Sequence, residues 1–157
     1  MNVEWGDNVI LKEIIDSISG VIVNGEFDES YKINKIKIDS RKVEAGDIFI
    51  AIKGKYQDGH KYIDDAINNG ATVIVVEDDV TVENVIVIKV VDTKKALLDL
   101  ASLMRTKHID TPLIAVTGSV GKTTTKELIY EILSTEYNVL KNEGNLNNHL
   151  GLPLTLF

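Results

Sequence analysis

The sequence predicts an α/β protein whose second part begins with a phosphate-binding loop. Apolar runs rich in β-branched residues, at 48–52 and 72–76, are typical of buried strands. Around them apolar residues recur with helical spacing, most clearly at 11–18 and 97–104. A short apolar run, a glycine turn and the residues Gly-Lys-Thr then follow one another at 113–123. We therefore expect an α/β domain followed by the start of a P-loop domain with a parallel sheet.

The first part divides into elements that can be taken in order. A helix over 11–18 has one apolar stripe, with Asp7 or Asn8 as its cap and Gly20 as the left-handed residue that ends it. The other expected elements are strands at 21–23, 33–38, 48–52, 72–76 and 85–91, a helix at 63–67 closed by Gly70, and a helix opened by Asp92 with the stripe Leu97, Leu100, Ala101 and Met104. Residues 108–112 break this last helix, so we predict domains at 1–110 and 111–157.

The composition excludes several classes of protein. A net charge of −7 argues against an extended nucleic-acid surface, although one local phosphate pocket is compatible with it. Because the chain has no cysteine, it has neither a disulfide framework nor a thiolate zinc site. The N-terminus does not resemble a signal peptide, and no run approaches the roughly 20 apolar residues of a membrane span. We expect a cytoplasmic protein with no nucleic-acid partner and no membrane insertion.

The phosphate loop is the strongest chemical signal in the sequence. Residues 113–116 are expected to form a buried parallel strand, and Gly121 opens a helix whose first N–H groups and dipole favour a phosphate. Lys122 is expected to reach the β- and γ-phosphates of ATP as the catalytic residue, and the Thr123 hydroxyl suits Mg²⁺. Val116 stands where the general motif has its first glycine, and an ordinary strand–helix turn is the alternative. The expected nucleotide-binding residues are Thr117, Gly118, Ser119, Val120, Gly121, Lys122, Thr123 and Thr124.

The second part is too short for a complete nucleotide-binding sheet. After the loop come a helix lined by Leu128, Ile129, Ile132 and Leu133 and a strand expected at 137–140. This supplies about one βαβ unit, whereas a doubly wound fold needs several. The sequence therefore suggests a truncated ATPase domain.

Four segments carry a resemblance to a known family: residues 39–41 with 46–51, Gly54 with 58–60, 117–127, and 144–148 through Pro153. Together they resemble the Mur ligases of bacterial cell-wall synthesis. The resemblance implies an N-terminal Mur-ligase-type α/β domain for the UDP end of the substrate, a central ATPase domain and a third domain for the incoming dipeptide. This chain would cover the first domain and the opening of the second.

The resemblance also implies a reaction. In such ligases ATP phosphorylates the peptide carboxylate of UDP-N-acetylmuramoyl-tripeptide, and the amine of D-alanyl-D-alanine attacks the acyl phosphate. The chain alone is expected to be inactive, because the later parts of the site lie beyond it. Two alternatives stay open: the related ligase that adds the third residue of the peptide, and a P-loop module that binds nucleotide without catalysis.

The candidate substrate-binding residues of the first part are indicated mainly by the resemblance, and less by their own chemistry or spacing. Taken alone, Ser40 and Arg41 favour a solvated turn at a strand end. The resemblance makes them candidates for the UDP-sugar, with the planar guanidinium of Arg41 suited to a phosphate and Asp39 suited to orienting Arg41 or the turn. Asp58 and His60 are candidates too, with a turn and a helix cap as the alternative.

Polar residues elsewhere are weaker candidates. Asn145, Asn147 and Asn148 offer amide groups to the substrate, with Asx turns as the competing explanation. Glu77 and Asp78 are expected to be solvated charges at a strand end. His108 and His149 lack the paired spacing of metal ligands.

Overall fold

The computed structural model describes residues 9–142, 144, 146 and 148–157. Five strands form one sheet in the order β1-β5-β4-β3-β2, where the strands are β1 (Val21–Asn24), β2 (Ile36–Lys37), β3 (Ile48–Ile50), β4 (Val73–Val76) and β5 (Ile86–Lys89). Strands β2 to β5 are parallel neighbours, and β1 pairs antiparallel with β5. The α/β class predicted from the sequence is confirmed, as are the five strands expected in the first part of the chain, although several are shorter than the apolar runs.

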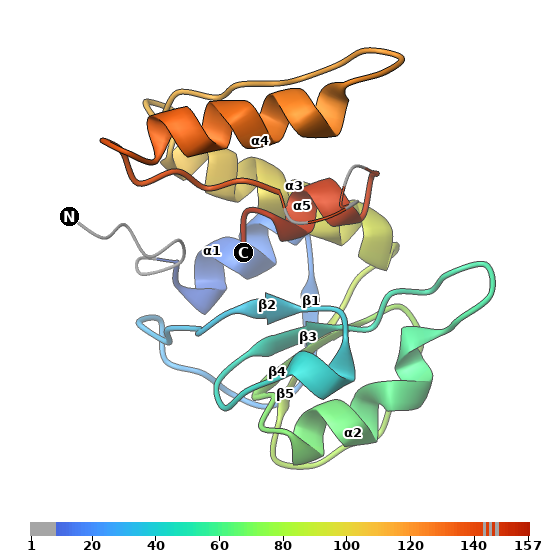
Figure 1. The fold of residues 1–157 in the computed structure, drawn as a ribbon. Coiled ribbons are helices and arrows are strands. Elements are labelled where there is room, and N and C mark those ends of the chain that lie inside the picture. Colours follow the sequence, from blue (N-terminus) through green and yellow to red (C-terminus); the bar gives the residue numbers. More distant parts are fainter. Residues whose placement is uncertain (1–8, 143, 145, 147) are drawn as a thin grey trace.

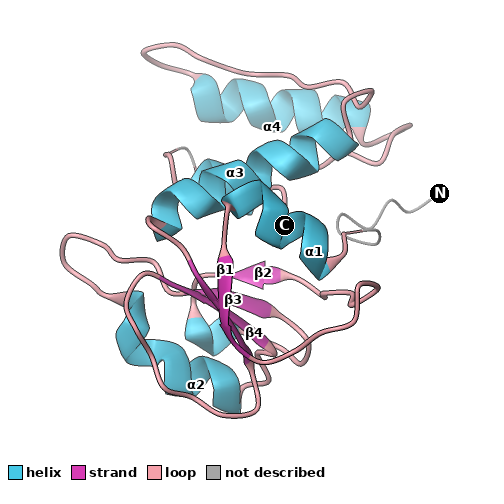
Figure 2. Cartoon of the chain, turned by 180° about the vertical axis from the view of Figure 1, so that it is seen from behind, coloured by secondary structure: helices cyan, strands magenta, loops and turns pink. Residues whose placement is uncertain are grey.

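Helices cover both faces of the sheet, which explains why the central strands are apolar on both sides. The helices α1 (Leu11–Ile18) and α3 (Thr93–Lys107) lie on one face, and α2 (Ile63–Asn68) lies on the other (Figures 1 and 2). The side chains of β4 alternate between two cores: Val73 and Val75 pack with α1 and α3, while Ile74 and Val76 pack with α2. All four are fully buried.

Two short 3-10 helices, η1 (Ser40–Lys42) and η2 (Gly59–Tyr62), follow β2 and β3. Each begins at an aspartate whose carboxylate accepts a hydrogen bond from a backbone N–H two residues further on. This side-chain cap replaces one of the missing hydrogen bonds at the start of a helix. These caps, at Asp39 and Asp58, place the polar residues that follow them at the ends of buried strands.

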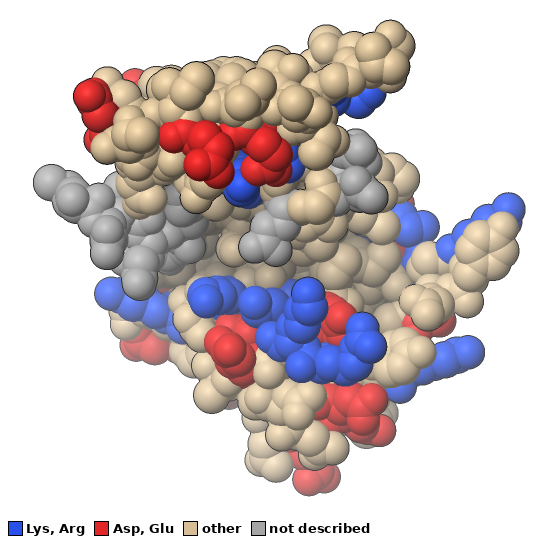
Figure 3. All heavy atoms as spheres, in the orientation of Figure 1, with Lys and Arg blue, Asp and Glu red and all other residues tan. Residues whose placement is uncertain are grey.

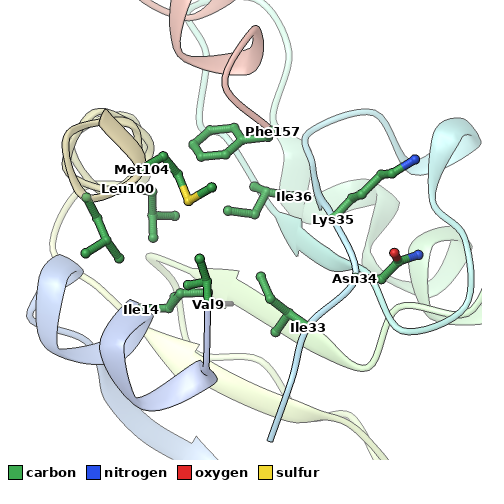
Figure 4. A pocket seen from close by; sticks show the side chains of 10 residues that line it. Val9, Ile14, Ile33, Asn34, Lys35, Ile36, Leu100, Met104 and Phe157 are labelled. Carbon is green, nitrogen blue, oxygen red and sulfur yellow. The ribbon is translucent and has the colours of Figure 1, made fainter. Parts of the chain in front are cut away.

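The last part of the chain packs less completely. The helix α4 (Lys122–Leu133) lies beyond α3, away from the sheet (Figure 1), and has no buried residue. The short helix α5 (Gly151–Leu154) contacts α3, and the Phe157 ring lies beside Met104 over the first core (Figure 4). The first core therefore takes in residues from beyond the expected boundary near residue 110.

Two expected strands are absent from the described residues. Residues 113–116 belong to no strand, with Leu113 71% and Ile114 56% exposed, so the prediction of a buried parallel strand is wrong for this chain. Residues 137–140 also form no strand. A parallel strand needs neighbours that complete its hydrogen bonds, and the described residues supply none beside these two segments.

The end of α1 also differs from expectation. The left-handed residue is Ser19, with φ of 51°, and not Gly20. A glycine is needed at the next position for a different reason, because a Cβ on Gly20 would collide with the side chain of buried Ile88. The start of α1 is capped at Ile10, whose N–H donates to Glu13. The expected caps Asp7 and Asn8 lie outside the described residues.

The other helix predictions are confirmed. Asp92 accepts hydrogen bonds from the backbone N–H groups of Lys94 and Lys95 at the start of α3. Gly70 follows α2 with φ of 107°, a left-handed conformation that glycine adopts without strain. No helix in the described part of the chain combines the length and the apolarity that crossing a membrane requires.

Candidate functional site

The phosphate loop is a continuous exposed turn that leads into α4. Gly121 occupies the N-cap of α4 with φ of 79°, and Gly118 has φ of 150°. A Cβ on Gly121 would meet nothing within 4 Å, so glycine is needed there for its backbone conformation and not for space. The Lys122 ammonium donates a hydrogen bond to the Gly118 carbonyl, which folds the lysine side chain back over the loop. Thr117, Ser119 and Val120 lie exposed in the same turn.

The residues of this loop fit a nucleotide phosphate and a magnesium ion. Because its N-cap is a glycine, α4 has no side-chain cap, and the N–H groups of its first turn are left for an anion. Thr123 and Thr124 are exposed in that first turn, and a threonine hydroxyl is a hard oxygen ligand of the kind that Mg²⁺ prefers. The helix predicted to follow the loop is confirmed.

The second candidate region lies on η1, at the end of β2. Arg41 donates from Nε and Nη2 to the two carboxylate oxygens of Asp39, at 2.9 and 2.8 Å. This confirms the expectation that Asp39 orients Arg41. The hydrogen bond from the Arg41 side chain lowers the pKa of the Asp39 carboxyl below its ordinary value. The guanidinium is exposed, and lysine and arginine side chains gather over β2 and η1 (Figure 3). Ser40 is buried, and its carbonyl accepts a hydrogen bond from Asn69.

The third region is the turn from β3 to η2, where Asp58 and His60 are both engaged within the protein. The Asp58 carboxylate accepts from the His60 backbone N–H and contacts His60 Nδ1 at 2.7 Å. On the other side of the ring, His60 Nε2 accepts from the backbone N–H of Glu77 at 3.0 Å. The turn and cap that the sequence offered as the alternative are present. Contact of these two residues with a substrate stays a prediction.

Glu77 is not the solvated strand-end charge that the sequence predicts. Its carboxylate accepts hydrogen bonds from both the backbone N–H and the hydroxyl of buried Thr93, at 2.8 and 2.7 Å. Asp78 is exposed, but it forms an ion pair with Lys53. Sequence reasoning missed these contacts because their partners are 16 and 25 residues away and only the fold of the sheet brings them together.

Asp58, His60 and Asp78 gather at a distance typical of metal ligands, with one possible ligand atom from each within 4.8 Å of the others. The donors around them account for this grouping without an ion. Lys53 neutralises Asp78, while the ring nitrogens of His60 already bond to Asp58 and to the Glu77 backbone. We therefore assign no metal to this group.

The asparagine-rich segment is described only in part. Asn148 accepts hydrogen bonds from the backbone N–H groups of Leu150 and Gly151, at 3.0 and 2.7 Å, as an Asx turn does. Asn145 and Asn147 lie outside the described residues. The residues just before this segment run beside α4 (Figure 1). Lys141 forms an ion pair with Glu127 of α4, and Lys126 of α4 donates to the Asn142 carbonyl.

The structure thus groups the candidates into separate places. Ser40 and Arg41 lie together on η1, and Asp58 and His60 lie together on η2, both beside the sheet. The phosphate loop leads into α4, which lies beyond α3 (Figures 1 and 2). An α/β scaffold followed by a glycine turn and an uncapped helix start is typical of proteins that bind nucleotides.

Comparison with known proteins narrows this class to one family. Residues 32–112 match the family described as Mur ligase family, catalytic domain, and residues 116–157 match the Mur ligase middle domain. The chain belongs to the Mur ligase family.

Relatives with curated names include the UDP-N-acetylmuramoyl-tripeptide–D-alanyl-D-alanine ligase of Bacillus subtilis, 39% identical over 93% of this chain and 32% of the relative. The UDP-N-acetylmuramoyl-L-alanyl-D-glutamate–2,6-diaminopimelate ligase of Clostridium perfringens is 36% identical over 91% of this chain and 30% of the relative. The chain therefore spans about a third of the length of the curated relatives it matches.

Solved structures give the same result. MurF from Acinetobacter baumannii superposes with a TM-score of 0.85 at 36% identity, covering 94% of this chain and 32% of that one. MurF ligase from Thermotoga maritima in complex with ADP superposes with a TM-score of 0.65 at 40% identity, covering 78% of this chain and 28% of that one.

Proposed function

We propose that this chain is the N-terminal part of an ATP-dependent ligase that adds D-alanyl-D-alanine to UDP-N-acetylmuramoyl-tripeptide in peptidoglycan synthesis. The observation that carries the proposal is the 39% identity to a ligase of that name over 93% of the chain. The phosphate loop at the start of α4 supplies the nucleotide chemistry that such a ligase needs.

In this proposal residues 1–110 bind the UDP end of the substrate, and residues 111–157 begin the ATP-binding domain. The basic surface over β2 and η1 supports the first assignment, because the UDP end carries two phosphates (Figure 3). The exposed, glycine-capped start of α4 supports the second. Peptidoglycan precursors of this kind are made in the cytoplasm, where we place the protein.

Lys122 is the residue we assign to catalysis. Its ammonium lies against the Gly118 carbonyl, within the loop that would surround the phosphates, where a cation offsets the charge that develops on a transferred phosphoryl group. Thr123 is the candidate ligand for Mg²⁺, which when bound would neutralise further phosphate charge. The residues of the loop, from Thr117 to Thr124, hold the phosphates through their backbone N–H groups.

The candidates for substrate contact are Ser40, Arg41, Asp58, His60 and the asparagines of the segment 144–148. Arg41 is the most direct candidate, because it is exposed and already oriented by Asp39. Charge-assisted hydrogen bonds from a planar guanidinium to a phosphate are stronger than neutral ones.

A second candidate function is addition of the third peptide residue. The similarity to the diaminopimelate ligase of Clostridium perfringens, 36% over 91% of this chain, favours it. The two ligases differ in the substrates in their names: one acts on the muramoyl tripeptide and the other on the L-alanyl-D-glutamate form. The choice between them is therefore a matter of substrate and not of fold.

Release of phosphate from ATP tests the proposal. With ATP, Mg²⁺, UDP-N-acetylmuramoyl-tripeptide and D-alanyl-D-alanine, this chain is expected to stay at background, while a full-length ligase that carries its sequence turns over. Replacing the tripeptide by UDP-N-acetylmuramoyl-L-alanyl-D-glutamate and the dipeptide by diaminopimelate separates the two ligases. In the full-length ligase Lys122→Ala should abolish turnover and leave the circular dichroism spectrum unchanged. Turnover by the 157-residue chain alone, or by the Lys122→Ala variant, would contradict the proposal.

A further inference from the structure

The loop between β3 and η2 is a tight turn with a fixed base and an exposed tip. At its base Lys53 and Asp58 form an isolated antiparallel bridge, and the Gly54 N–H donates to the Gln57 carbonyl at 2.8 Å. A Cβ on Gly59 would come within 2.7–2.9 Å of the backbone of residues 51 and 52, so the chain enters η2 in direct contact with β3. At the tip, Tyr56 is 88% exposed.

Hydrogen bonds and the β-bridge of the loop join this base to the ends of the neighbouring elements in a closed ring. The Lys53 N–H donates to the Thr93 hydroxyl at 3.3 Å, and that hydroxyl donates to the Glu77 carboxylate at 2.7 Å. The Glu77 N–H donates to His60 Nε2, and His60 Nδ1 bonds to Asp58. The β-bridge between Asp58 and Lys53 completes the ring, through the hydrogen bonds from Gly54 N–H to Gln57 and from Gly59 N–H to Ile52. The ring thus connects the ends of β3 and β4 with the first residue of α3.

Among the residues of this closed ring of contacts, His60 is the one whose protonation is most restricted by its partners. A backbone N–H is always a donor, so Nε2 has to accept the bond from Glu77 and cannot carry a proton. The proton of a neutral imidazole must then be on Nδ1, where it donates to Asp58. The His60 side chain is only 10% exposed, so water cannot readily replace either partner.

We propose that His60 is a positioning residue, held as the neutral Nδ1–H tautomer, which fixes the loop 53–58 at the carboxyl edge of the sheet for the substrate. This rests on the function proposed above and assigns His60 a task that needs no contact with substrate. Ligands of parallel α/β sheets bind outside the carboxyl ends of the strands, where this loop lies. A loop ordered in advance lowers the entropy cost of binding.

The tautomer can be measured without any ligand. In the ¹⁵N-labelled 157-residue chain, long-range ¹H–¹⁵N correlation of the imidazole rings should show His60 with a protonated Nδ1 and an unprotonated Nε2 at pH 7. The exposed His149 is the internal comparison, and its ring is expected to exchange between tautomers. A His60 ring protonated at Nε2, or averaged between tautomers, would overturn the proposal.

Two substitutions of His60 distinguish a role of its ring nitrogens in positioning the loop from a role of the size of its side chain. His60→Phe keeps an aromatic ring but removes both nitrogens, and should speed hydrogen exchange of the Glu77 amide. It should also weaken binding of UDP-N-acetylmuramoyl-tripeptide by about tenfold, the scale of one lost hydrogen bond to a buried group. His60→Gln places a carbonyl oxygen near the position of Nε2, so it should restore most of the protection of Glu77 and most of the affinity. Lys12→Gln, which alters an exposed ion pair on α1, is the surface control.

The outcomes distinguish the two proposals. Equal affinity and equal Glu77 exchange in the wild type and His60→Phe would overturn the positioning role, whatever the ligase does. If the wild type does not bind the muramoyl tripeptide, the proposed function fails and the substrate part of this inference fails with it. The tautomer and the Glu77 exchange would still decide whether His60 holds the loop.

Discussion

Replacing Thr93 by valine removes one hydroxyl from the centre of the hydrogen-bonded ring and keeps the shape of the side chain. Thr93 is fully buried, and its hydroxyl donates to the Glu77 carboxylate at 2.7 Å and accepts from the Lys53 N–H at 3.3 Å. A hydrogen bond to a charged group contributes about 1.5–3 kcal/mol, and the lost acceptor for Lys53 adds a smaller cost. The Glu77 carboxylate keeps its second bond, to the Thr93 backbone N–H. We expect the free energy of unfolding to fall by about 2–3 kcal/mol.

Urea unfolding followed by circular dichroism measures this loss. Thr106→Val is the matched control, because Thr106 lies exposed on the same helix and its hydroxyl donates to the Ser102 carbonyl of the preceding turn. The control should change the unfolding free energy by less than about 0.5 kcal/mol, as surface substitutions usually do. A Thr93→Val variant as stable as the control would refute the claim that the ring holds the strand ends together.

Two further predictions concern stability. Gly20→Ala should cost about 1–3 kcal/mol by overpacking against Ile88, and an unchanged urea midpoint would contradict the close approach seen here. The hydrogen bond from His60 lowers the pKa of the Asp58 carboxyl, so its contribution is complete above the carboxyl's unfolded pKa, near pH 4, and is lost as the pH falls through the lower folded value. Asp58→Asn should therefore unfold with less dependence on pH below about pH 4 than the wild type, and equal slopes would contradict the bond.

The sequence was most informative where burial or a local motif decides the structure. Strands β3 and β4 are apolar at every position because both their faces are covered. The caps at Asp58 and Asp92 depend on backbone groups two or three residues away, so a short stretch of sequence contains the whole interaction. The phosphate loop could be predicted for the same reason, because its residues are continuous in the sequence.

Features that depend on distant partners could not be predicted in this way. The sequence predicts that Glu77 is a solvated charge. In the fold the sheet places Thr93 beside it, although Thr93 is 16 residues further along the chain. The sequence predicts that Gly20 ends a helix, whereas glycine is needed there because the side chain of Ile88 of β5 leaves no room for a Cβ. Residues 113–116 have the composition of a buried strand, but composition cannot supply the neighbouring strand that would pair with them.

The central claim, that this chain recognises the UDP end of a muramoyl peptide, is tested most directly by calorimetric titration with UDP-N-acetylmuramoyl-tripeptide. The wild type should bind one molecule, and Arg41→Ala should weaken binding by about tenfold, because it removes a charge-assisted bond to phosphate. Lys42→Ala removes a neighbouring positive charge from the same short helix and should cost less. Equal affinity of the wild type and Arg41→Ala would show that Arg41 does not bind the substrate. If the wild type does not bind, the claim itself is contradicted.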